Sequence, residues 1–174
     1  FGLTYKDLPY FRTLHSIAFR ALGLQKQDVM AKSDWNFLSD KLNMDFSGVT
    51  AINPEDGVMI PSAVSDGALY VQIITKARYS KTSLGKAFKE ANNYNLHFFM
   101  LEKIDENLRA YKQGMMKVDF TDMIDVYTQE IETPELDLLI VDEAQDLTPL
   151  QWDMVAKMAA NSAFTYYAGD DDQA

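Results

Sequence analysis

The stretch DLLIVDEAQD, residues 137–146, constrains the fold of this chain more than any other. Its four aliphatic residues, Leu138 to Val141, run without a polar interruption, and three acids follow within five positions. An uninterrupted apolar run bounded by turn signals is typical of a strand that is buried on both faces of a parallel sheet. We therefore predict a buried parallel strand that ends in a cluster of acids.

A capped helix and a second strand follow. Thr148 suits the N-cap position, Pro149 the first helical position, and Gln151 the third position of a capping box. This helix is predicted to run to about Ala160, and Phe164–Ala168 is predicted to form the next strand. A strand, a helix and a strand within about thirty residues make a βαβ unit.

The second strand also ends in acids, in the stretch AGDDDQA. Ligands of parallel sheets bind beyond the carboxyl ends of the strands, so both acidic ends predict a site. Asp142 and Glu143 point to opposite sides of an extended chain, so one can hold Mg²⁺ and the other can orient an attacking water. Gln145 and Gln173 can hydrogen-bond phosphate oxygens or that water without adding charge. Gly169 allows a close backbone approach.

The rest of the chain is predicted to be mostly helical. Apolar periodicity predicts helices over 14–22, 69–77, 93–113 and 120–131, and a short helix, capped by Ser33, that carries Trp35, Leu38 and Leu42. Gly114 is placed to end the longest helix, and Asp119 to cap the one after it. Residues 43–67 hold prolines and glycines that predict loops. We expect a helical lobe over 29–117, inserted into an α/β core formed by 1–28 and 118–174.

The charge is divided unevenly along the chain. The net charge is −10, but 15 basic residues and 12 acids precede Asp119, whereas Lys157 and 14 acids lie from Asp119 onward. The first part therefore carries +3 and the second −13, and most of these carboxylates are expected to form a solvated surface. An apolar content of 47% predicts a folded protein, and the absence of Cys excludes disulfides and Cys-based zinc sites. No apolar run is long enough to span a membrane.

One basic stretch contains five cations with no acid between them. These are Lys76, Arg78, Lys81, Lys86 and Lys89, interleaved with Tyr79 and Phe88. Such a patch can follow a phosphate backbone and stack a base, or it can be a solvated helix face that balances the acidic core. The sequence leaves both interpretations open.

Four segments together resemble superfamily-one helicases of the UvrD/Rep type. In the family's order they are TLHSIAFRAL at 13–22, VDFTDMI at 118–124, LLIVDEAQDL, which resembles a Walker B segment, and AGDDDQA. The resemblance implies an α/β fold that is part of a RecA-like P-loop NTPase parallel sheet with an inserted, mostly helical subdomain. It implies ATP and Mg²⁺ as cofactors, and single-stranded DNA and single-strand/double-strand junctions as partners. It also implies 3′ to 5′ translocation, in repair or replication, in a bacterial or phage-infected cytoplasm or in a nucleus.

The resemblance also assigns roles to individual residues. It makes Asp142 the Mg²⁺ ligand, Glu143 the general base and Gln173 the sensor of the γ-phosphate. Gln145, Gly169 and Asp170 would belong to the nucleotide site, and Thr13 and His15 would face the DNA strand.

The family's phosphate loop, Gly-x-x-x-x-Gly-Lys-Ser/Thr, is not present in the chain. The nearest stretch, SKTSLGKAF, has Ser80 in place of the first Gly and Ala87 in place of the hydroxyl residue. We therefore expect an internal fragment of a motor domain that does not hydrolyse ATP alone. Two alternatives remain open. One is a Mg²⁺-dependent nuclease, which needs acids from several elements to converge, and the other is a non-catalytic DNA-binding module that keeps a relic NTPase fold.

Overall fold

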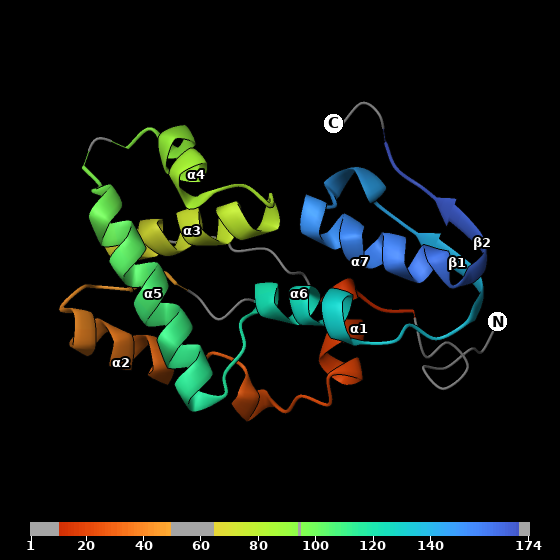
Figure 1. The fold of residues 1–174 in the computed structure, drawn as a ribbon, viewed down its shortest axis with the longest axis horizontal. Helices are drawn as coiled ribbons and strands as arrows, with labels where there is room; N and C mark the ends of the chain where they lie inside the picture. The colour runs from red at the N-terminus through yellow and green to blue at the C-terminus, as the bar shows by residue number, and fades with distance from the viewer. Residues whose placement is uncertain (1–10, 50–64, 94, 171–174) are drawn as a thin grey trace.

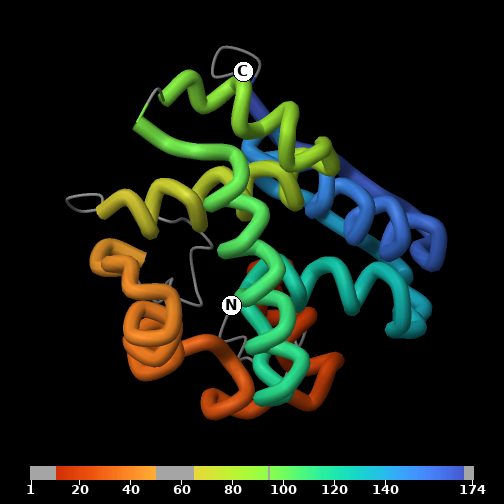
Figure 2. The backbone as a smooth tube through the Cα atoms, turned by 60° about the vertical axis from the view of Figure 1, so that its left-hand side comes forward, coloured from red at the N-terminus to blue at the C-terminus, as the bar shows by residue number. Residues whose placement is uncertain are grey.

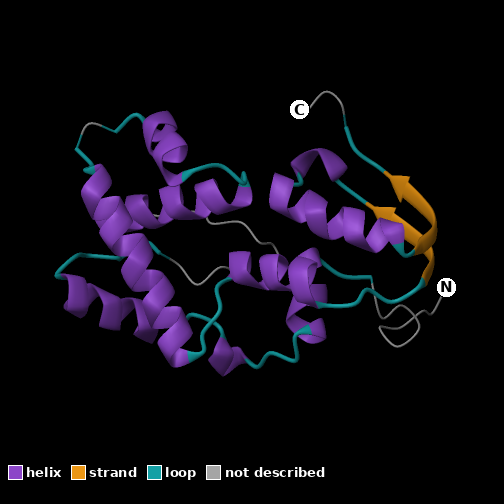
Figure 3. Cartoon of the chain, in the orientation of Figure 1, coloured by secondary structure: helices purple, strands orange, loops and turns teal. Residues whose placement is uncertain are grey.

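In the computed structural model, the chain is described over residues 11–49, 65–93 and 95–170. This part of the chain is mostly helical and has one small parallel sheet, so it is mixed α/β (Figure 1, Figure 3). The helices are α1 (Leu14–Ala21), α2 (Lys32–Leu42), α3 (Asp66–Tyr79), α4 (Leu84–Ala91), α5 (Phe98–Met115), α6 (Phe120–Glu130) and α7 (Pro149–Ala160). The strands are β1 (Leu136–Val141) and β2 (Ser162–Tyr167), and two short 3₁₀ helices are η1 (Lys26–Asp28) and η2 (Ala144–Asp146).

The predicted βαβ unit is confirmed. Strands β1 and β2 pair in parallel, with Leu138 opposite Phe164 and Val141 opposite Tyr167, and α7 connects them (Figure 1). The capping box of α7 is also present, because the Thr148 N–H donates to Gln151 Oε1 at 2.9 Å and the Gln151 N–H donates to Thr148 Oγ1 at 3.4 Å.

The prediction that the first strand is buried on both faces is wrong for the described residues. Leu139 packs against the core and Val141 is buried, but Ile140 is 64% exposed and Tyr166 on β2 is 62% exposed. Among the described residues, α7 packs against one face of this two-stranded sheet. The other face presents apolar side chains outward.

Buried apolar side chains form two separate clusters. The first cluster, here the lobe core, contains Met30, Trp35, Leu38, Phe46, Tyr70, Val71, Ile73, Ile74, Ala77, Ala87, Leu96, Leu101, Ile104 and Leu108. The second cluster, here the sheet core, contains Ile17, Ala18, Phe120, Met123, Ile124, Tyr127, Leu150, Met154 and Met158. Helices α2 to α5 therefore pack together, and α1, α6 and α7 pack with the sheet (Figure 2).

The chain passes between the two cores at two adjacent points. The Met30 N–H donates to Val118 O at 2.9 Å, and the Val118 N–H donates to Asp28 O at 2.8 Å. Val29 and Val118 thereby form an isolated parallel bridge. Lys117 Nζ adds a hydrogen bond to Gln27 O at 2.6 Å. We call this pair of crossing segments, 27–30 and 117–118, the neck.

Several predicted helix ends differ from the structure. Ala31, not Ser33, is the N-cap of α2. The predicted helix over 93–113 begins later, at Phe98, and α4 was not predicted. Gly114 does not end α5, because the left-handed C-cap position is taken by Met116, with φ of 50°. Of the predicted loop over 43–67, residues 50–64 lie outside the described part of the chain.

Candidate functional site

The carboxyl ends of the two strands are joined by backbone hydrogen bonds that continue beyond the strands themselves. The Ala168 N–H donates to Val141 O at 2.8 Å, and the Ala144 N–H donates to Ala168 O at 2.9 Å. This second bond places the turn after β1 directly beside Gly169. The two acidic ends that the sequence predicts to meet are therefore adjacent.

Asp142 and Glu143 form the exposed tip of β1. Glu143 adopts the left-handed region, with φ of 50° and ψ of 43°, a conformation that non-glycine residues rarely adopt and that is common at functional sites. Its N–H donates to Asp142 Oδ1 at 3.1 Å.

Gln145 connects the two strand ends through its side chain. Its Nε2 donates to Glu143 Oε2 at 2.7 Å, and its Oε1 accepts from the Asp170 N–H at 3.1 Å. Gly169 lies against the same amide: a Cβ placed there would be 2.6 Å from Gln145 Oε1. Three predicted nucleotide-site residues, Glu143, Gly169 and Asp170, thus each contact Gln145.

The tip of β1 fits a magnesium site that relies on water. Mg²⁺ keeps several waters and is often bound by one or two carboxylates together with substrate phosphates. Asp142 is exposed at the strand end and can supply one such carboxylate. Within residues 11–49, 65–93 and 95–170, no group of three or more His, Cys, Asp or Glu is placed to hold a metal ion. The predicted catalytic residue Gln173 lies outside the described residues.

The two residues predicted to face DNA at the start of α1 have different positions. Thr13 is exposed and caps α1, because its Oγ1 accepts from the Ser16 N–H at 3.3 Å. His15 is only 4% exposed, and its ring packs edge-on against Phe120 with a centroid distance of 5.6 Å. Burial lowers the pKa of His15 to about 4, so the ring is neutral at physiological pH. The His15 side chain therefore packs in the protein interior and does not face solvent.

The predicted basic patch is largely engaged in ion pairs. Lys76 pairs with Glu90 at 3.2 Å, and Lys86 approaches the same carboxylate at 3.9 Å. Lys81, in the turn after α3, pairs with Asp153 on α7. Lys89 is exposed on α4.

For Arg78, the prediction of a DNA-facing basic patch is wrong. Its guanidinium bonds Asp119 at 3.0 Å and also bonds Asp122, so it points into the protein and not toward a partner. The correction follows from long-range contacts: the acids that neutralise Arg78 lie about forty positions away in the sequence.

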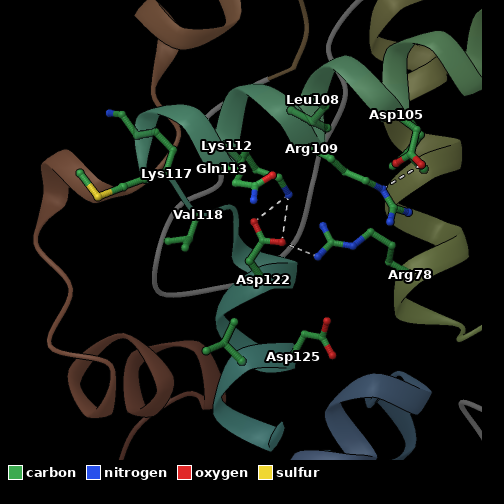
Figure 4. Close-up of a pocket in the computed structure, with 13 residues that line it drawn as sticks. Arg78, Asp105, Leu108, Arg109, Lys112, Gln113, Lys117, Val118, Asp122 and Asp125 are labelled. Carbon is green, nitrogen blue, oxygen red and sulfur yellow. Dashed lines mark hydrogen bonds and ion pairs between the residues drawn. The ribbon is translucent and has the colours of Figure 1, made fainter. Parts of the chain in front are cut away.

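Arg78 and Lys112 hold Asp119 and Asp122 in a compact cluster, here the four-charge cluster. Figure 4 shows three of its members, Arg78, Lys112 and Asp122. Lys112 Nζ lies 2.6 Å from Asp119 Oδ2 and 2.7 Å from Asp122 Oδ2. Burial alone would raise the pKa of Asp119, but Lys112 and Arg78 outweigh it and hold that pKa below its usual value. The same two acids cap α6 reciprocally, each backbone N–H donating to the other carboxylate at 2.8 Å.

The four-charge cluster lies where the lobe core meets the sheet core. Arg78 comes from α3 and Lys112 from α5, whereas both acids belong to the first turn of α6. Three of the four residues line a cleft of about 550 Å³, together with Ile74, Asp105, Leu108, Arg109, Gln113, Met116, Lys117, Val118, Asp125 and Val126. Sequence reasoning recognised Asp119 as a cap but missed this cluster. A signal was available, because Lys112 continues the buried stripe of Leu101, Ile104 and Leu108.

A parallel βαβ unit whose two acidic strand ends meet is typical of α/β proteins, which bind ligands at the carboxyl edge of the sheet. The chain belongs to the UvrD/REP helicase family, since residues 4–174 match that family's N-terminal domain. It is therefore part of a superfamily-one DNA helicase, and this membership implies the use of ATP and Mg²⁺ and the binding of DNA. Comparison with the curated proteins and with the solved structures found no significant match. Among the described residues, no helix combines the length and the apolar character needed to cross a membrane.

Proposed function

We propose that this chain is part of a RecA-like motor domain that couples ATP hydrolysis to 3′–5′ movement along single-stranded DNA and to the opening of duplex DNA. The observation that carries the proposal is the junction of the two strand ends, where Asp142 and Glu143 lie beside Gly169 and Asp170. Sheets of this class bind nucleotides at such an edge. The family's phosphate loop is not among these residues, and we propose that another part of the complete protein supplies it.

In this proposal the residues at the tip of β1 divide the chemistry between them. Asp142 would hold Mg²⁺ of the substrate MgATP, partly through water, and the metal would neutralise charge on the phosphates. Glu143 would orient the attacking water and accept its proton. Gln173 would contact the γ-phosphate. Positioning and charge stabilisation supply most of the rate in phosphoryl transfer, so the fixed geometry of this tip is central.

We also propose the domain division into a core of 1–28 and 118–174 and an inserted subdomain of 29–117. Two separate apolar clusters support this division, and so does the neck, where the chain crosses between them. For DNA contact we propose five residues that are all exposed: Thr13, Lys76, Lys81, Lys86 and Lys89. Arg78 and His15 are excluded from this set because both side chains are engaged in the interior.

The test is DNA-stimulated ATP hydrolysis by the complete protein that contains this chain, with and without Glu143→Gln. The substitution keeps the shape and removes the base, so we expect turnover to fall by about 10²- to 10⁴-fold while ATP binding persists. Asp137→Asn is the matched control, because Asp137 is an exposed acid at the opposite end of the same strand. Its turnover should equal that of the unaltered protein.

The proposal fails if Glu143→Gln retains full ATP hydrolysis. EDTA-sensitive cutting of DNA without ATP would favour the nuclease instead. DNA binding that depends on salt but never responds to nucleotide would favour the non-catalytic module.

A further inference from the structure

We propose that Gln145 is the positioning residue for the Glu143 carboxylate, and that position 169 is glycine because the Gln145 amide fills the space that a side chain would need. The inference rests on the proposed function, since it assigns roles around the same general base. In it, Gln145 and Gly169 act through Glu143 and need not touch the nucleotide.

The two hydrogen bonds of the Gln145 amide fix its orientation. The Asp170 N–H is a donor only, so the atom 3.1 Å away must be Oε1, which accepts. The amide nitrogen then faces Glu143 Oε2 at 2.7 Å, where it donates. A flipped amide would set two donors together at one end and two acceptors together at the other. The backbone of the second strand end therefore dictates which atom Gln145 presents to Glu143.

This contact restrains a carboxylate that is otherwise exposed. Glu143 stands at the surface on a left-handed backbone turn, where a long side chain has several rotamers available. Gln145, itself half-buried, holds Oε2. Glu143 Oε1 accepts no hydrogen bond from the described residues, so it is the oxygen placed to receive a proton from water. Precise placement of a general base is worth a large part of its catalytic effect.

Gly169 is constrained by space and not by its backbone angles. Its φ is outside the left-handed range, so an alanine could adopt the same backbone conformation. An added Cβ, however, would lie 2.6 Å from Gln145 Oε1, which is closer than real contacts allow. The next neighbours, Gln145 N at 3.4 Å and Ala144 N at 3.6 Å, are at ordinary contact distance. The obstacle to a side chain at 169 is thus the Gln145 amide.

A double-mutant cycle in the complete protein tests this arrangement. We expect Gln145→Ala to lower the kcat of DNA-stimulated ATP hydrolysis by on the order of 100-fold, with KM for ATP little changed. Gly169→Ala should cause a similar loss, because its methyl group displaces the amide. The double variant should be no slower than Gln145→Ala alone, because the obstacle has gone.

A third variant separates the two hydrogen bonds and does not depend on the folding of Gly169→Ala. Gln145→Glu keeps an acceptor for the Asp170 N–H but replaces the donor with a second carboxylate. We expect a lower kcat with KM for ATP little changed, because the second carboxylate repels Glu143 Oε2 and no longer holds it. If Gln145 acted only by holding the Asp170 N–H, Gln145→Glu would keep the kcat of the unaltered protein.

The outcomes distinguish this inference from the proposed function. If Glu143→Gln abolishes turnover but Gln145→Ala keeps full kcat, the inference is wrong and the proposed function stands. If the losses of the two alanine variants multiply in the double variant, the two positions act independently and the inference is also wrong. If Glu143→Gln itself retains activity, the proposed function fails.

Discussion

The imidazole of His15 is buried and has a strongly lowered pKa. The ring is buried between α1 and α6, and its Nε2 has no hydrogen-bond partner among the described residues. Burial without a counter-charge favours the neutral form, which lowers the pKa of His15 from 6.5 to about 4. Protonating this side chain therefore favours the unfolded state.

We expect the free energy of unfolding to depend on pH through His15. Between pH 6.5 and about 4 the unfolded chain binds a proton that the folded chain excludes, so stability is full above this range and falls as the pH decreases through it. The difference between the two pKa values of His15 corresponds to a decrease of about 3 kcal/mol in the free energy of unfolding. The measurement is urea unfolding at several pH values across the range.

The control for this prediction is His15→Phe, which keeps an aromatic ring against Phe120 but cannot titrate. Its stability should stay nearly flat over the same pH range. The pKa values of Asp34 and Asp119 are lowered from 3.8, so protonation of these two acids decreases the free energy of unfolding only below about pH 3.8. Equal pH slopes in the two proteins would contradict the role given to His15.

Among the secondary-structure elements, those with strong local chemistry were predictable from the sequence. The N-caps Thr148 and Asp119 act through bonds to residues three positions away, so the sequence alone contains both partners. At the start of α2 the N-cap residue, Ala31, has no side-chain acceptor. Instead, the Ala31 N–H donates to Asp34 Oδ2, three positions later, at 2.7 Å. Met116 takes a left-handed angle because the chain must turn there to reach the neck, and no local signal predicts that.

Helix α6 is held against α3 and α5 by charge as well as by apolar contact, which gives a prediction for Arg78→Leu. Removing one cation leaves Asp119 and Asp122, both half-buried, with Lys112 alone, and a partly uncompensated charge at such a position is costly. We expect a loss of about 3 kcal/mol in the free energy of unfolding. Chemical denaturation of the two proteins measures it.

Arg109→Leu is the matched control for Arg78→Leu. Arg109 lines the same cleft, but its side chain is 70% exposed and pairs with Asp105 on its own helix (Figure 4). Exposed pairs of this kind contribute less than about 1 kcal/mol. Similar losses for the two arginine variants would show that the four-charge cluster is no more stabilising than a surface pair.

At the scale of the whole molecule, the sequence predicted the meeting of the acidic strand ends but not the joining of the two cores. The meeting of the strand ends follows from topology, because the carboxyl ends of neighbouring parallel strands lie at one edge. The joining of the cores depends on Arg78, Lys112 and the neck, whose partners are distant in sequence. The predicted DNA contacts of Arg78 and His15 were wrong for the same reason. A sequence shows that a residue is charged or aromatic, but long-range packing decides whether its side chain is exposed.

The two tryptophans of the chain can report on the two cores separately, and they give the last prediction. Trp35 belongs to the lobe core, whereas Trp152 lies on α7 next to Tyr167, with a ring centroid distance of 5.5 Å. In the single-tryptophan variants Trp152→Phe and Trp35→Phe, fluorescence therefore follows one core at a time. Within each variant, we expect the fluorescence midpoint in urea to coincide with the midpoint from far-ultraviolet circular dichroism, because the neck and the four-charge cluster couple the cores.

Adding Arg78→Leu to both single-tryptophan variants should separate these midpoints. The substitution removes the link from α3 to α6 and leaves the interior of each apolar cluster unchanged. Each core should then unfold at its own urea concentration, and the two fluorescence curves should bracket the circular dichroism curve. Separate midpoints before Arg78 is replaced would mean that the cores are independent folding units. Midpoints that still coincide afterwards would assign the coupling to the neck and to the remaining pairs, such as Lys81 with Asp153.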